Sequence, residues 1–253
     1  NGKNNGEITL NVPDGWDVQP KAAKVSFNKQ GQSKTVTFEV LPPETVQEGA
    51  FDIDVVARGK GGQFSTQVQP IHYDHIGTSY WLRDAKVNVK AFSLKLVDGL
   101  KVGYVDSGFD KVGQALQQVG VDVTFLDEEA LKSGDLSQYD TIVVGIRAYL
   151  SRDDLLKHND RLKDYVKNGG HVVMQYHKPG DNWSAELAPY PIQPGNPSIE
   201  WRVTDETAPV TFLHPEHPVF HAPNTITEKD FDGWVQERGL YFPSSWDDAY
   251  TPL

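Results

Sequence analysis

Polar side chains that could do chemistry follow two apolar runs, 141–144 and 172–174, in the second half of the chain. They are Arg147, Tyr149, Gln175, Tyr176 and His177. A histidine can act as a general base because its pKa lies near neutrality. An arginine suits a carboxylate or a sugar hydroxyl because its guanidinium is rigid and always charged. These residue types indicate a ligand-binding site or a hydrolase.

Both principal candidates also have a structural interpretation. Arg147 can pair with a nearby acid and fix a loop, and His177 can be a hydrogen-bonded loop histidine. The chain has no cysteine, and no serine lies in a nucleophile elbow beside these residues. His177, Arg147 and Glu237 are therefore candidate catalytic residues without an accompanying nucleophile.

The segment 229–243 holds a second group of candidates, in which aromatic residues surround Glu237 and Arg238. The aromatic residues here and just beyond are Trp234, Tyr241, Phe242 and Trp246. Aromatic faces pack against sugar C–H surfaces, so these rings can form a saccharide platform. They can equally plug the mouth of a sheet. Trp234 and Arg238 join the five strand-end residues as candidate ligand-binding residues.

Two histidine clusters, 214–221 and 72–75, raise the question of a metal site. Zinc requires three or four converging ligands. Prolines hold the first cluster extended, and in the second His75 points away from the strand face shared by His72 and Asp74. We expect neither a metal nor another cofactor.

The elements that must position these residues alternate between strand and helix. The predicted strands are 102–105, 121–126, 139–146 and 171–176, and the predicted helices are 111–119, 127–131 and 153–167. This order is typical of a parallel, flavodoxin-like α/β sheet, in which chemistry gathers at the carboxyl ends of the strands. The turn at 103–108 matches no phosphate-loop motif, so Asp106 or Ser107 is predicted to cap the first helix. A proline-rich loop region with a strand at 209–213 follows.

The first half of the chain reads as β throughout. Alternating segments occur at 7–12, 24–27, 33–40, 51–57 and 64–71. They predict an antiparallel β-sandwich domain over 1–85 that lacks its first strands. Residues 86–98 are then a linker or an extra strand, and 99–253 form the α/β domain.

The charge is unevenly distributed. Residues 1–98 carry no net charge, so the whole formal charge of −11 lies in residues 99–253. Such a field repels phosphate backbones and argues against nucleic acid and anionic membranes as partners. No apolar run reaches bilayer-spanning length and no signal peptide is visible, so we expect no membrane insertion.

Several motifs resemble known families. The motifs VVGIRAY, YVKNGG, HVVMQYH and EHPVF resemble the class I glutamine amidotransferase-like fold, in particular its ThuA-like branch. The motifs NVPDGWDVQP and HYDHI are similar to the β-sandwich associated with alpha-galactosidases. The two together, followed by EKDFDGWVQERGLYFP, resemble the C-terminal region of large exported PIG-L (LmbE-like) deacetylases.

This resemblance implies a domain that has lost the catalytic residues of its relatives. The amidotransferase nucleophile falls at about Tyr176 or His177, where no cysteine stands, and the deacetylase zinc motif is absent. His177 matches in type the histidine that follows this strand in the ThuA-like branch. We therefore expect a non-catalytic accessory region of a secreted or periplasmic carbohydrate-active protein. It would bind or position saccharide, or pack on an upstream catalytic domain of the same polypeptide. The alternatives are a cysteine-less hydrolase and a purely structural scaffold.

Overall fold

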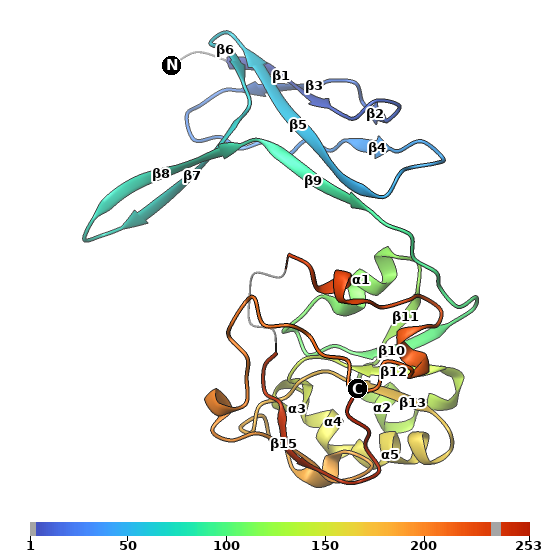
Figure 1. Ribbon diagram of the computed structural model, residues 1–253. Helices are drawn as coiled ribbons and strands as arrows, with labels where there is room; N and C mark the ends of the chain where they lie inside the picture. The colour runs from blue at the N-terminus through green and yellow to red at the C-terminus, as the bar shows by residue number, and fades with distance from the viewer. Residues whose placement is uncertain (1–3, 234–238) are drawn as a thin grey trace. The chain divides into compact units, whose positions relative to one another are not determined.

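The structure is a computed structural model that describes residues 4–233 and 239–253 (Figure 1). The chain forms two compact units that divide after Leu94. The N-terminal unit consists of antiparallel sheets, and the C-terminal unit contains a four-stranded parallel sheet with helices. Mixed α/β content with antiparallel sheets first is therefore confirmed.

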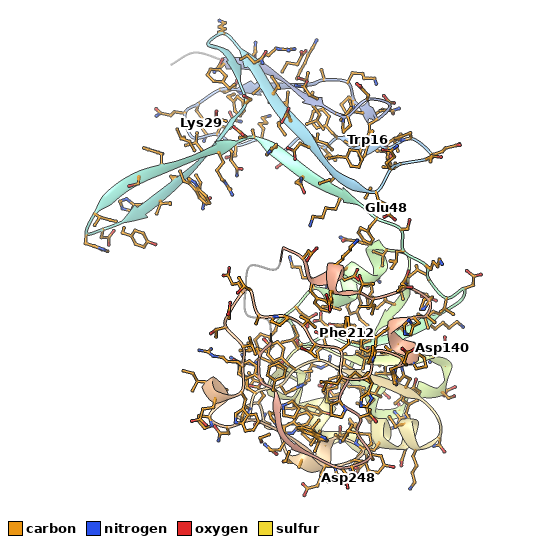
Figure 2. All side chains as sticks on the ribbon, in the orientation of Figure 1. Trp16, Lys29, Glu48, Asp140, Phe212 and Asp248 are labelled. Carbon is orange, nitrogen blue, oxygen red and sulfur yellow. The ribbon has the colours of Figure 1, made fainter. Side chains whose placement is uncertain are left out.

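The main N-terminal sheet is built around a long central strand, β5. Its strands are β1 (Asn4–Asn11), β3 (Ala23–Phe27), β5 (Gly49–Gly59), β6 (Gly62–Phe64) and β9 (Lys86–Ala91). The segment that forms β9 was predicted to be a linker or an extra strand. In the structure it is a strand, which pairs with the first half of β5. Ile53 is buried on the face of β5 that it shares with Phe51 and Val55, as the alternating pattern requires, and Val56 is buried on the opposite face. Trp16, labelled in Figure 2, packs its ring against Phe51 of the same unit.

Two further strand pairs complete the unit and correct the prediction. The segment 33–40 forms a strand only at its end, where β4 (Glu39–Leu41) pairs with β2 (Asp17–Gln19). A hairpin of β7 (Thr66–Tyr73) and β8 (Gly77–Asp84) projects from the main sheet (Figure 1). Every residue of both strands is exposed. The sequence did not predict β8 because its apolar residues occupy both faces and give no two-residue period.

The C-terminal sheet has the order β11 (Asp122–Phe125), β10 (Lys101–Val105), β12 (Thr141–Val144), β13 (His171–Met174), and all neighbours are parallel. Ile142 and Val144 of β12 face one core, and Val143 faces the other. Because β12 is buried on both sides, its sequence is an unbroken apolar run. The carboxyl ends of these strands lie along one edge of the sheet.

Helices cover both faces of this sheet. Helix α1 (Val112–Gln118) packs with β11, and the other face is covered by α2 (Glu128–Ser133), α3 (Ala148–Ser151), α4 (Asp153–Lys157) and α5 (Asn159–Lys167). The predicted single helix over 153–167 is interrupted at His158, which leaves helical geometry with φ −110° and ψ 16°. Helix α3, directly after Arg147, was not predicted.

The predicted cap of α1 was wrong. Asp106 and Ser107 accept hydrogen bonds from the backbone two residues ahead, at Gly108 and Phe109, and so close local turns. The helix begins later, and Asp110 accepts the amide of Val112 at 2.9 Å instead. The N-cap residue itself is Lys111, whose side chain makes no capping hydrogen bond.

The proline-rich region is mostly irregular. Its strand β14 (Ile192–Pro194) pairs antiparallel with the distant strand β15 (Pro243–Trp246), and 209–213 is not a strand. Short 3-10 turns occur in and after this region at Ala185–Leu187, Ser198–Glu200, Pro218–Phe220 and Glu228–Phe231. One more, Leu136–Gln138, precedes β12. Phe212, which is labelled in Figure 2, packs its ring against Phe220 and Phe231, so the loop folds on its own aromatic residues. Among the described residues, no helix is long and apolar enough to cross a membrane.

The turn before β13 requires a glycine at position 170, because there is no room for a side chain. A Cβ on Gly170 would lie 2.4 Å from the ring of Tyr165. Replacing Gly170 with alanine should lower the free energy of unfolding by about 1–3 kcal/mol, because the buried ring has to shift. Gly180→Ala is the control, since nothing lies within 4 Å of its Cβ position. Equal urea midpoints for the two variants would contradict this account.

Candidate functional site

The ends of β12 and β13 are joined through Arg147. This residue has a left-handed backbone conformation, with φ 55°, between β12 and α3. Its amide donates a hydrogen bond to the carbonyl of Tyr176 at 3.1 Å. The unusual backbone therefore turns the chain out of the sheet while it ties two strand ends together.

The guanidinium of Arg147 is held by a buried carboxylate. Its Nε and Nη2 donate to the two carboxylate oxygens of Asp181 at 2.8 and 2.7 Å. Asp181 is only 1% exposed, and it also accepts the backbone amide of Lys178. Burial pushes the pKa of Asp181 upward, but the bonds from Arg147 and Lys178 outweigh burial and hold the pKa below its usual value.

Sequence reasoning did not identify Asp181. The available signal was the Pro179-Gly180 pair, which predicts a turn that carries the next residue back toward the strand ends. The pairing gives Arg147 the acidic partner that its structural interpretation requires.

His177 is buried and uses both ring nitrogens internally. Its Nδ1 lies 2.9 Å from the carbonyl of Gln175, and its Nε2 accepts the amide of Tyr149 at 3.3 Å. These partners assign a neutral ring with the proton on Nδ1. Burial lowers the pKa of His177 below its ordinary 6.5. The geometry suits a residue that holds the loop after β13, and no free nitrogen is left for a substrate proton.

Tyr149 belongs to an aromatic cluster beneath the site. It is fully buried, and its hydroxyl donates to Oδ1 of Asn159 at 2.5 Å. Its ring lies 5.1 Å from that of His177 and 5.8 Å from that of Trp183. Burial also raises the pKa of Tyr149. As a predicted ligand-binding residue, Tyr149 can only support the site from below, because a ligand cannot reach its side chain.

Gln175 leads to a second network that the sequence did not reveal. Its side-chain amide donates to the hydroxyl of Tyr104 at 3.1 Å, and that hydroxyl donates to Asp110. Asp110 also accepts the amide of Ile146, so one carboxylate links β10, α1 and the end of β12. Burial, followed by the bond to Asp110, raises the pKa of Tyr104.

A cavity of about 600 Å³ lies beside edge strand β13, and we call it the β13 cavity. Gln175, Tyr176 and His177 are in its wall. The apolar lining includes Met174, Trp183, Ile192, Leu240, Tyr241 and Phe242. Tyr176 stacks on Tyr241 with ring centroids 5.2 Å apart and stays 40% exposed. A mostly apolar cavity with a few polar groups is typical of small-molecule sites.

The structure brings only some of the predicted aromatic residues together. Tyr241 and Phe242 line the β13 cavity, and Tyr176 joins them. Trp246 lies on β15, is 47% exposed, and does not line the cavity. Trp234, Glu237 and Arg238 fall outside the described residues.

The histidine clusters form local hydrogen bonds. His72 bonds to Thr78, His221 to the carbonyl of Pro215, and His217 accepts the amide of Val219. Within 4–233 and 239–253, no three His, Asp or Glu side chains converge as a metal ion would require.

The Arg147–Asp181 pair should contribute strongly to stability. Arg147→Met leaves a buried carboxylate without its partner and should lower the free energy of unfolding by about 2–4 kcal/mol in urea titrations. Lys163→Met is the control, because Lys163 pairs with Asp160, whose side chain is 90% exposed, and should cost no more than about 1 kcal/mol. Similar losses in the two variants would contradict a buried, charge-dependent link.

The lowered pKa of His177 predicts acid sensitivity. As pH falls below 6.5, the unfolded chain binds a proton that the folded chain excludes, so the free energy of unfolding falls until pH reaches the lowered native value. The slope from this one proton should approach about 1.4 kcal/mol per pH unit. Denaturation between pH 5 and 7 would measure it, above the range where Asp181 titrates. His177→Gln should flatten the slope, and an unchanged slope would assign it to other groups.

Comparisons with known proteins identified no relative of this chain. No protein-family model, curated protein or solved structure matches the chain. The function of this site must therefore be inferred from its own residues.

Proposed function

We propose that the chain is a non-catalytic, saccharide-binding accessory region of a larger secreted carbohydrate-active protein. The supporting observation is a contrast at the strand ends. Both nitrogens of His177 and two nitrogens of Arg147 are consumed by internal bonds, while the adjoining β13 cavity presents accessible aromatic rings. Such a site can hold a ring-shaped ligand without a group that reacts with it.

The finer fold assignment belongs to the same proposal. The strand order β11-β10-β12-β13 agrees with a flavodoxin-like sheet of the amidotransferase-like type, and the N-terminal unit agrees with an incomplete β-sandwich. The motifs that resemble PIG-L (LmbE-like) deacetylases support placing such a region beside a catalytic domain. In this assignment the loop that would carry a nucleophile carries exposed Tyr176 and buried His177.

A purely structural role is the second candidate. It is favoured by the Arg147–Asp181 pair, which is the type of internal salt bridge that a scaffold would contain. Saccharide binding is preferred because the aromatic rings leave a cavity of about 600 Å³ open instead of filling it. We do not propose the hydrolase alternative, since His177 would first have to break its bonds to two backbone groups.

Calorimetric titration with neutral oligosaccharides tests this function. Tyr176→Ala should weaken binding about 3- to 10-fold, the loss expected for one aromatic stacking contact. Tyr80→Ala is the matched control, because Tyr80 is an exposed tyrosine of the N-terminal unit, and it should bind as the unchanged chain does. Absence of binding, or binding that is insensitive to Tyr176, would favour the scaffold. Turnover of an oligosaccharide or an N-acetyl sugar by the purified protein would contradict the non-catalytic assignment.

A further inference from the structure

Cations lie against aromatic rings at the carboxyl edge of the parallel sheet. The guanidinium carbon of Arg147 lies 5.2 Å from the ring centroid of Phe109, and Nζ of Lys178 lies 5.1 Å from that of Tyr241. Tyr241 in turn stacks on Tyr176. We call these five residues the cation–aromatic strip. Two of its rings, Tyr176 and Tyr241, also line the β13 cavity.

Four of the five residues are linked through Asp181 or the charge of Arg147. The bond to Asp181 raises the pKa of Arg147 most, burial opposes that rise, and Tyr176 and Tyr241 reinforce it. Lys178 is bound to the same Asp181 through its backbone amide at 2.9 Å. The two cations are therefore anchored on one carboxylate, one by its side chain and the other by its backbone.

Within the part of the chain that the structure describes, the strip carries one positive charge without a carboxylate partner. The charge of Arg147 is balanced by Asp181, which engages Nε and Nη2 and leaves Nη1 without a partner among the described residues. The ammonium of Lys178 has no ion pair with any carboxylate that the structure describes. A cation beside accessible aromatic rings attracts an anionic group carried on a ring-shaped ligand.

We infer that the saccharide bound here is acidic, with a uronic-acid ring against Tyr176 and its carboxylate directed to Lys178 and to Nη1 of Arg147. This inference rests on the proposed saccharide-binding function and narrows its ligand class. It also gives Lys178 a role that a neutral ligand would leave unused.

A carboxylate suits the charge around the cation–aromatic strip better than a phosphate does. The net charge of −11 lies entirely in residues 99–253, so the unit as a whole repels anions. One negative charge can be met by the ammonium of Lys178, which has no ion pair within residues 4–233 and 239–253. A doubly charged phosphate would bring a second charge into the same field without a second cation among the described strip residues.

Two trisaccharides that differ at one position test the inference. Cellotriose and the same trimer with a C6 hydroxymethyl group oxidised to a carboxylate should be titrated into the full chain at low ionic strength. The oxidised trimer should bind about tenfold more tightly, and the preference should shrink with added salt as the charges are screened. Lys178→Gln should reduce the affinity ratio to about twofold or less.

Lys101→Gln is the charge-matched control, because Lys101 is exposed at the opposite end of β10, and it should keep the full ratio. Equal binding of the two trimers by the unchanged chain would overturn the inference and leave the proposed saccharide binding standing. Binding of neither trimer would contradict both the acidic ligand and the proposed saccharide binding. A trimer phosphorylated at the same position that binds more tightly than the oxidised one would overturn the choice of a carboxylate.

Discussion

Desolvation of one carboxylate organises the carboxyl edge of the parallel sheet. Asp181 is almost fully buried, and a buried charge is tolerated only with close, well-oriented partners. Arg147 and the amide of Lys178 supply them from the end of β12 and the loop after β13. Because Arg147 also bonds to the carbonyl of Tyr176, this one pairing fixes the position of both strand ends.

This constraint separates two kinds of residue. Polar groups beneath the edge, such as His177 and Gln175, bond to backbone or to other side chains and keep the loops in place. Aromatic groups above it, such as Tyr176 and Tyr241, are left accessible. Ring stacking is thereby assigned to the accessible tyrosines, while the buried polar groups stabilise the fold.

The sequence predicted the parts of the fold that follow from local pattern. Apolar runs predicted the four parallel strands, most clearly β10 and β12, which are buried on both faces. It did not reveal contacts between distant residues. Asp181 is 34 positions from Arg147, and Gln175 is 71 from Tyr104, so no spacing rule connects them. The site was located by topology, but the roles of its residues depend on partners that only the folded chain supplies.

The β7–β8 hairpin has a consequence for how the protein behaves in solution. Val68 and Leu82 lie on one face of this ribbon and Trp81 on the other, so turning it over cannot hide its apolar surface. A two-stranded ribbon with apolar residues on both faces cannot form a hydrophobic core of its own. The tendency of the N-terminal unit to aggregate during expression or concentration will thus depend strongly on this protrusion, together with exposed apolar residues of the main sheet such as Phe64 and Val87.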